Sequence, residues 1–240
     1  MLEMKDNHNL WYTQQCERVY PTASENMAWD QQLIKALPNN TRTLRWYTWK
    51  DPGITYSYKQ ECPKNMVHID NAKRSTGGGI VFHSPGDIVF SIASWKNDPL
   101  YTGSLTQKLK TVSQYIQSVL QEKGIVLDSE TTIPHINTPD TNAQEGYHER
   151  CTYYPTPFEI MHKGKKVCGL TIRRYKDKFL VQGIVHTQPS HPSFLPLLGD
   201  EPPFTDVLDV FQADFIHYCQ RAVTTKEATT NPMPTQNNEG

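Results

Sequence analysis

The most prominent chemical feature of the sequence is a run of three glycines, Gly77, Gly78 and Gly79. Glycine loses more backbone entropy on folding than any other residue, so three in succession need a physical reason. One reason is a tight bend before the apolar segment 80–82. The other is close approach of the main chain to a ligand, because successive N–H groups can converge on an anionic or carbonyl oxygen. The run fits neither a Walker A loop nor the Gly-x-Gly-x-x-Gly pattern.

A second candidate is Lys166, which follows Gly164 and Lys165 at the start of a predicted hairpin. Lysines on turns are usually solvated, and composition alone favours that interpretation. If the side chain instead enters a site, its ammonium ion could stabilise an oxyanion that develops on a substrate carbonyl. The same charge could also lower the pKa of a nearby thiol.

Cys151 is the third candidate. Cysteines are commonly inert core residues, but the polar segment 147–150 before this one predicts a position near a surface or cleft. His148 and Arg150 could favour a thiolate if they fold back towards it. The remaining cysteines have no such context and are interpreted as structural: Cys16, Cys62, Cys168 and Cys219.

Length and composition restrict the class of protein. The chain has 240 residues, 37% hydrophobic and 20% charged, which is typical of one globular domain, predicted at 1–223. A net charge of −1 does not imply a strongly basic face for nucleic acid, although it leaves room for a local basic patch. No apolar run predicts a signal peptide or a membrane span. Five cysteines without a Cys-x-x-Cys spacing favour a reducing, cytoplasmic location and argue against a structural zinc site.

Helices that would position these groups are predicted at 23–37 and 105–123. Thr22 and Glu25 have the spacing of a capping box before the first helix. The second has apolar residues at steps of three and four, and Gly124 is expected to end it in the left-handed conformation. Three further segments are predicted: a long loop at 127–150, a helix at 204–223 and a disordered tail at 224–240.

The remaining elements are predicted to be strands. Two hairpins are expected, one around the turn 84–86 and one around the polar turn 175–177. Their strands, and a separate aromatic strand, span 79–83, 87–92, 166–172, 179–185 and 43–49. The order lacks regular βαβ alternation, which predicts an α+β fold with mixed, largely antiparallel sheets flanked by helices.

A family resemblance supports this fold. The run RSTGGGIVFH at 74–83 resembles the Arg-x-x-Gly-Gly-Gly-x-Val-x-His signature of the lipoate–protein ligase and octanoyltransferase superfamily, which includes biotin ligases. The resemblance extends over about 29–183 and implies a biotin/lipoate ligase-like catalytic domain. It implies a substrate-binding role for six residues: Arg74, Gly77, Gly78, Gly79, His83 and Gly169. For His83 a structural hydrogen bond is favoured over proton transfer.

The resemblance also bears on the lysine and the cysteine. The run GKKVCG at 164–169 is similar to the family's Gly-[Arg/Lys]-Lys-[Ile/Val]-x-Gly, whose second basic residue enters the active site and corresponds to Lys166. The segment 151–160 resembles the Cys-x-x-x-Pro-Ser-x-Tyr-Glu-Leu segment of cysteine-dependent octanoyltransferases. This implies that Cys151 carries the acyl group as a thioester, while Lys166 and N–H groups of 77–79 hold the oxyanion.

The implied activity is transfer of an octanoyl or lipoyl group to a lysine of a lipoyl carrier domain, without a cofactor or metal. Implied acceptors are lipoyl domains of 2-oxoacid dehydrogenases or the glycine cleavage H protein, and implied donors are octanoyl-acyl carrier protein or free lipoate. One alternative is an ATP- and Mg²⁺-dependent lipoate–protein ligase acting through lipoyl-AMP. Another is a non-catalytic acyl- or carrier-binding module, because Gln182 stands where the family has histidine and Ser84 where ligases often have aspartate.

Overall fold

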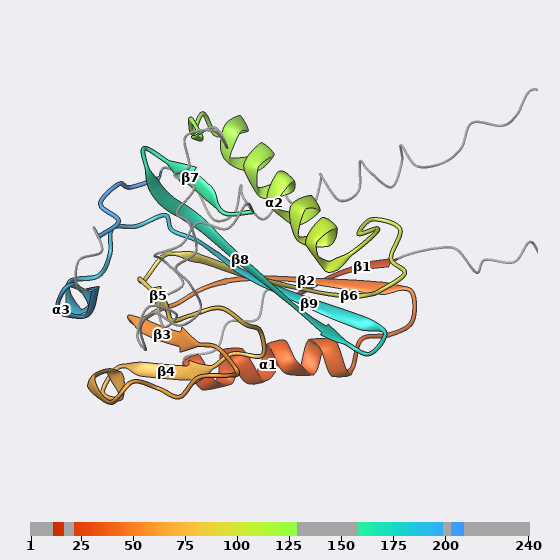
Figure 1. The fold of residues 1–240 in the computed structure, drawn as a ribbon, viewed down its shortest axis with the longest axis horizontal. Helices are drawn as coiled ribbons and strands as arrows, with labels where there is room; N and C mark the ends of the chain where they lie inside the picture. Colours follow the sequence, from red (N-terminus) through yellow and green to blue (C-terminus); the bar gives the residue numbers. More distant parts are fainter. Residues whose placement is uncertain (1–11, 17–21, 129–157, 199–202, 209–240) are drawn as a thin grey trace, which may run out of the picture.

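The computed structural model describes residues 12–16, 22–128, 158–198 and 203–208 (Figure 1). They form an α+β architecture of two sheets flanked by helices, which confirms the predicted fold class. In this part of the chain, no helix is long and apolar enough to cross a lipid bilayer.

The larger sheet has six strands in the order β1-β2-β6-β9-β8-β7. β1 and β2 are parallel, whereas every other neighbouring pair of this sheet is antiparallel. The strands span Tyr12–Cys16 (β1), Thr41–Thr48 (β2), Ile88–Trp95 (β6), Lys178–Val185 (β9), Lys165–Tyr175 (β8) and Ile160–His162 (β7).

The smaller sheet has three strands in the order β4-β3-β5, which span Asp70–Lys73, Gly53–Tyr56 and Val81–His83. β3 is parallel to β4 and antiparallel to β5. The smaller sheet and helix α1 (Ala23–Lys35) lie on one side of the larger sheet, and helix α2 (Leu105–Glu122) lies on the other (Figure 1).

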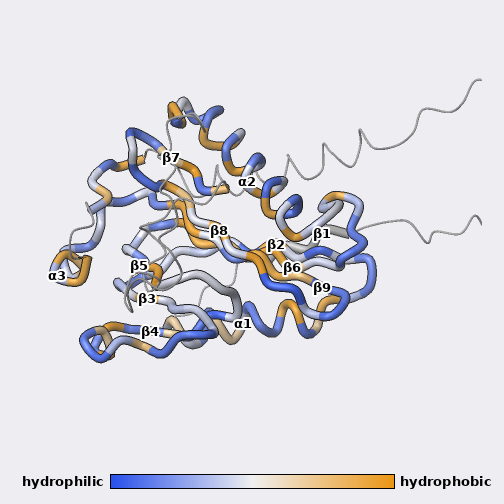
Figure 2. The backbone as a smooth tube through the Cα atoms, viewed as in Figure 1, coloured by the Kyte–Doolittle hydropathy of each residue, from blue (hydrophilic) through white to orange (hydrophobic). Residues whose placement is uncertain are grey.

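Alternation of side chains along the strands divides the hydrophobic core between these two sides. On β2, Trp46 faces α2 and packs against Phe90 with the two rings tilted by 37° and 4.7 Å between their centroids. The next residue, Tyr47, faces α1 and packs in the same cluster as Met27. Hydrophobic segments accordingly follow the central strands of the larger sheet (Figure 2).

The two predicted long helices are confirmed to within two residues at their ends. Thr22 and Glu25 form the expected capping box, in which the Glu25 N–H donates to the Thr22 hydroxyl and the Thr22 N–H to the Glu25 carboxylate. Ser104 and Gln107 form a second box at the start of α2. Gly124 follows α2 with φ of +80°, the left-handed conformation that ends a helix.

The hairpin predicted around 175–177 is confirmed, because β8 and β9 pair directly. The hairpin predicted around 84–86 is wrong: β5 pairs with β3 in the smaller sheet, whereas β6 pairs with β2 and β9 in the larger one. The turn exists, but it carries the chain from one sheet to the other. The physical reason is that Phe82 packs with Phe194 beside the smaller sheet, while Phe90 packs beneath α2.

The helix predicted at 204–223 is wrong over its first residues, 204–208, which are not helical. The Phe204 carbonyl accepts from the Ser190 N–H and the Leu208 N–H donates to the Thr187 carbonyl, so this segment bonds to the chain after β9 and not to itself. Residues 209–223, the tail at 224–240 and most of the predicted loop, 129–150, lie outside the described residues. In the described residues after β9, two short helical segments are present: a 3-10 helix at Pro192–Phe194 (η4) and α3 at Leu195–Leu198.

Candidate active site

A cavity lies between the two sheets, with about 540 Å³ of empty space that includes its opening to solvent. Its wall is mainly apolar and includes Met27, Val89, Leu170 and Ile184. Eight residues with polar side chains also line it, namely Tyr47, Thr55, Arg74, His83, Lys166, Thr171, Gln182 and His186. An apolar cavity with few polar groups is the usual form of a site for a small or chain-like ligand.

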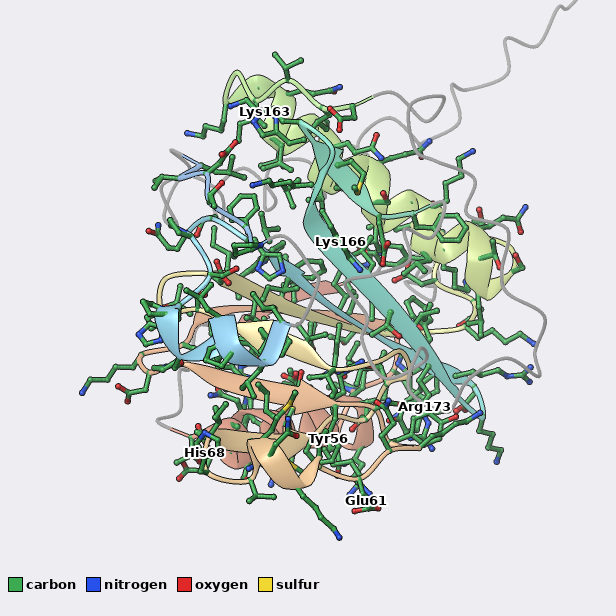
Figure 3. The ribbon with its side chains drawn as sticks, turned by 60° about the vertical axis from the view of Figure 1, so that its left-hand side comes forward. Tyr56, Glu61, His68, Lys163, Lys166 and Arg173 are labelled. Carbon is green, nitrogen blue, oxygen red and sulfur yellow. The ribbon has the colours of Figure 1, made fainter. Side chains whose placement is uncertain are left out.

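Lys166 reaches this cavity because of an irregularity in β8. Ile160 pairs with Cys168, but the next residue of β7, Met161, pairs with Lys166, so Val167 is an extra residue in β8. Such a bulge re-aims the neighbouring side chains. Val167 and Cys168 are consequently both buried in the core on the α2 side, and the tip of Lys166 lies inside the fold (Figure 3).

Gly169 makes room for the lysine. A Cβ atom at this position would lie 3.0 Å from Cε and 3.4 Å from Nζ of Lys166. Gly169 lines the same cavity. The glycine is therefore explained by the passage of the lysine side chain over it, a reason that only the folded structure supplies.

The ammonium group of Lys166 forms a buried ion pair with Glu159, and the two side chains are 9% and 3% exposed. Glu159 directly precedes β7, and the preceding Phe158 carbonyl accepts from the Ser113 hydroxyl of α2 at 2.8 Å. Removing one partner of a buried pair costs about 3–5 kcal/mol, so the carboxylate holds the ammonium firmly in place. Glu159 was not predicted as a site residue, although the segment that resembles octanoyltransferases contains it.

Arg74 holds the glycine run in place through hydrogen bonds to its carbonyl groups. Its guanidinium donates to the Gly77 carbonyl at 2.7 Å, the Gly79 carbonyl at 2.6 Å and the Thr55 carbonyl at 3.1 Å. Gly78 has φ of +91°, which a side chain would strain. Gly77 has open space around its missing Cβ, so neither packing nor a positive φ requires glycine there.

Four of the predicted site residues therefore line one cavity: Arg74, His83, Lys166 and Gly169. The three glycines of the run are not among the residues that line it. The loop borders on the cavity through the Arg74 guanidinium that binds its carbonyl groups. A ligand role for the loop N–H groups stays a prediction.

His83 is 3% exposed, and its Nε2 lies 2.9 Å from the Thr55 hydroxyl. Its ring stacks on Trp49 at 4.2 Å between centroids. Burial, with smaller effects of His186 and Arg74, holds the pKa of His83 well below its usual value, so the imidazole is neutral at pH 7. These contacts suit a hydrogen-bonding role more than proton transfer.

Gln182, in the position where the family resemblance leads one to expect histidine, is the centre of a buried polar network. Its amide donates to Asp30 at 2.7 Å and accepts from the Thr76 hydroxyl at 2.7 Å. Asp30 also pairs with Arg45 at 2.7 Å. Gln182 therefore connects the residue before the glycine run to α1 with both ends of its amide bonded.

A second polar pair on the cavity wall was not predicted. The Nδ1 of His186 lies 3.0 Å from Oδ2 of the fully buried Asp87. These residues are 99 positions apart, and His186 follows the last residue of β9. No local pattern could have indicated their contact.

Cys168 is buried beside the Lys166–Glu159 pair. Burial raises the pKa of its thiol far more than the neighbouring ammonium lowers it, so the thiol is protonated and unreactive at pH 7. This agrees with its interpretation as a structural residue. Cys151, the predicted nucleophile, lies outside the described residues. Within the described part of the chain, no group of three His, Cys, Asp or Glu side chains could hold a metal ion.

Comparison with known proteins identifies the family of the chain. Residues 22–206 match the model of the lipoyl protein ligase A/B catalytic domain. The chain is 26% identical over 227 residues to octanoyltransferase LipM of Brevibacillus brevis, covering 88% of this chain and 77% of that protein. It is 27% identical over 166 residues to octanoyltransferase LipM of Clostridioides difficile, covering 65% of this chain but only 58% of that one.

Two solved structures share the fold. The bi-partite lipoate protein ligase of Thermoplasma acidophilum superposes with a TM-score of 0.63 at 15% identity, over 91% of this chain and 85% of that one. Lipoate-protein ligase A bound with ATP superposes with a TM-score of 0.62 at 18% identity, over 91% and 85% of the two chains.

Proposed function

Because the chain belongs to the lipoyl protein ligase A/B catalytic domain family, we propose that it transfers an octanoyl or lipoyl group to a lysine of a lipoyl carrier domain. The observation that carries the proposal is the buried ammonium of Lys166 at an apolar cavity between the two sheets. The cavity supplies surface for an acyl chain, and the ammonium supplies charge for its carbonyl.

The apolar wall accounts for binding. An octanoyl group has seven carbons beyond its carbonyl, and burial at about 0.8 kcal/mol per methylene contributes on the order of 5 kcal/mol before the costs of ordering. Leu170 and Ile184, from neighbouring strands β8 and β9, would contact such a chain. A hydrocarbon chain needs few polar partners, which suits this wall.

Lys166 accounts for catalysis. As a nucleophile attacks the acyl carbonyl, negative charge develops on its oxygen, and a preorganised ammonium in a water-poor site stabilises it. Glu159 keeps the ammonium in one place before the substrate arrives. The fixed position matters because the stabilisation needs no reorganisation at the moment of reaction.

The donor is a thioester in this proposal, and the transferred group is octanoyl, in line with the two octanoyltransferase relatives. The Cys151 thiolate attacks the octanoyl carbonyl, the bond to the carrier sulfur breaks, and the carrier leaves as a thiol after taking up a proton. The carrier-domain lysine then attacks the Cys151 thioester, and the Cys151 thiolate leaves. A thioester already carries the activation, so the scheme needs no nucleotide or metal.

The acceptor is a lipoyl domain of a 2-oxoacid dehydrogenase or a glycine cleavage H protein. The archaeal ligase with the same fold was described together with its E2 lipoyl domain, which supports this class of partner. Two large proteins must use the site in turn, one as donor and one as acceptor. A covalent acyl-enzyme lets one site serve both.

Intact mass spectrometry tests the proposal. The chain is incubated with octanoyl-acyl carrier protein and a lipoyl domain, and separately with free lipoate with and without ATP. We expect one octanoyl group on the lipoyl domain without ATP. Modification only from free lipoate with ATP would favour the ligase alternative, and binding of the lipoyl domain without any mass change would favour a non-catalytic module.

Two variants locate the chemistry. Cys151→Ser should abolish the hydroxylamine-sensitive acyl adduct on the chain, and full transfer by this variant would exclude the covalent scheme. Lys166→Gln should lower transfer by about 10²–10³-fold, the usual effect of removing one oxyanion donor. Lys165→Gln is the matched control, because the Lys165 amine bonds to the Pro203 carbonyl and the Thr205 hydroxyl and does not line the cavity.

A further inference from the structure

Asp87 is a fully buried carboxylate whose oxygens are all engaged. Its Oδ1 accepts from the backbone N–H groups of Thr187 at 2.9 Å and Gln188 at 3.3 Å. Its Oδ2 accepts from the Ser84 N–H at 3.1 Å and faces Nδ1 of His186 at 3.0 Å. Four donors therefore fix the carboxylate at the point where the chain crosses between the two sheets.

The Asp87 carboxylate determines which ring nitrogen of neutral His186 carries the proton. A carboxylate can only accept here, so Nδ1 of the imidazole carries the proton and Nε2 of the neutral ring has a free lone pair. Within the described residues, Nε2 makes no hydrogen bond. His186 lines the cavity and its side chain is 13% exposed, so the ring is within reach of a substrate.

The other titratable groups on the cavity wall cannot accept a proton as readily. His83 is buried, and its Nε2 is occupied by the Thr55 hydroxyl. Lys166 is already cationic in its pair with Glu159, whose carboxylate is thereby engaged. Arg74 has a guanidinium that stays protonated in proteins. Nδ1 of His83 also has no hydrogen-bond partner, but it is buried, so His186 is the described cavity histidine whose unbonded nitrogen a substrate can reach.

The proposed acyl transfer needs such a nitrogen. The acceptor lysine must lose a proton as its nitrogen bonds to the acyl carbon, because the product is a neutral amide. We propose that Nε2 of His186 is the general base that takes this proton, and that Asp87 is a positioning residue that sets the tautomer and orientation of the ring. The inference rests on the proposed function and deepens it.

The step balances as follows. The amine nitrogen forms the bond to the acyl carbon, and the carbon–sulfur bond breaks with its electron pair on sulfur. The proton from the amine moves to Nε2, and the imidazolium then returns it to the departing thiolate or to water. The nearby Asp87 carboxylate stabilises the imidazolium while it exists, without itself taking the proton.

The test measures transfer from an octanoyl thioester to two nucleophiles, a lipoyl domain and hydroxylamine. Hydroxylamine is uncharged at neutral pH and needs little help from a base. His186→Ala should lower transfer to the lipoyl domain by about 10²–10⁴-fold, the range of general base catalysis, and lower enzyme-dependent hydroxamate formation much less. Added imidazole should restore part of the lysine transfer. His68→Ala, at an exposed histidine away from the cavity (Figure 3), is the matched control and should behave as the parent chain.

Asp87→Asn tests the positioning role. The side-chain amide introduced by this substitution would donate to Nδ1 of His186 and force the proton onto Nε2, so lysine transfer should fall while hydroxamate formation persists. Persistence of hydroxamate formation also shows that the variant is folded. If it loses both reactions and its thermal transition, His186→Gln replaces it in the same comparison.

The outcomes separate the two proposals. No transfer to the lipoyl domain by the parent chain would refute the proposed function. Transfer by the parent chain together with equal transfer by His186→Ala would refute only the role of His186. Equal losses with both nucleophiles and no rescue by imidazole would also refute it, because a purely structural role predicts that pattern.

Discussion

Substitution of Gly169 by alanine would move the side chain of Lys166, the proposed catalytic lysine, without removing it. The new Cβ would lie 3.0 Å from Cε of Lys166. Carbon atoms in favourable contact lie at about 3.5–4.0 Å, so the tip of the lysine must move by roughly 0.5 Å or more. A misplacement of about 1 Å can reduce catalysis 10²-fold. We therefore expect kcat of octanoyl transfer to fall by about 10–100-fold, with the lysine still present.

Stability should change little in the same variant. Alanine lowers the entropy of the unfolded chain and contributes about 0.4–1 kcal/mol, which offsets part of the overlap with a flexible lysine tip. The free energy of unfolding in urea is therefore expected to stay within about 1 kcal/mol of the parent chain. Gly183→Ala is the contrasting control. Its Cβ would lie 2.2 Å from the Phe90 ring and 2.8 Å from Leu170, so it should destabilise the fold by about 1–3 kcal/mol or more.

The assay is steady-state octanoyl transfer to a lipoyl domain, followed by mass spectrometry, beside urea unfolding of each variant. The reasoning requires that Gly169→Ala lose activity and keep stability. Parent-like kcat in this variant would show that the position of the Lys166 ammonium is not critical. A large loss of stability would show that the lysine tip cannot move aside.

Two further predictions concern the glycine run and the buried histidine. Gly77→Ala should leave the free energy of unfolding in urea unchanged or raise it by about 0.4–1 kcal/mol, because no atom lies within 4 Å of the added Cβ. If the loop approaches the acyl group, the same variant should have a higher KM for the octanoyl donor. An unchanged KM would contradict that role of the loop. Folding lowers the pKa of His83, so below about pH 6.5 the unfolded chain binds a proton that the folded chain does not. The free energy of unfolding therefore decreases as the pH decreases, by about 1.4 kcal/mol per pH unit, until the pKa of the folded state is reached. His83→Gln should reduce this slope between about pH 6.5 and 5 and His68→Gln should not; equal slopes in both variants would contradict the assignment.

Local chemistry in the sequence was sufficient for several elements. Thr22 and Glu25 indicated the start of α1, and the apolar spacing before Gly124 indicated α2, because caps and helical periodicity act within a few residues. The β8–β9 hairpin was also readable, since its turn lies between two apolar runs. The family signature at 74–83 indicated the superfamily, and the match of residues 22–206 to the family model confirmed it.

The tertiary structure alone decided how the chain divides between sheets. The turn at 84–86 is local, but whether it closes a hairpin depends on which partners the flanking strands find. Phe82 packs against Phe194, and Phe90 packs in the core beneath α2. Likewise Phe204 lies in a segment that bonds to the chain after β9 and not to itself.

Some features of the candidate site were likewise indicated by the sequence, and others were decided only by the tertiary structure. The sequence by itself indicated candidate site residues, because Lys166, Arg74 and the glycine run lie in short patterns, and the structure places Lys166 and Arg74 at one cavity. The structure decided what surrounds them: the bulge at Val167 that turns the lysine inward, and the contact of Asp87 with a histidine 99 residues away. A pattern within a few residues reports local backbone and side-chain chemistry, whereas contacts between distant segments arise only when the whole chain has packed.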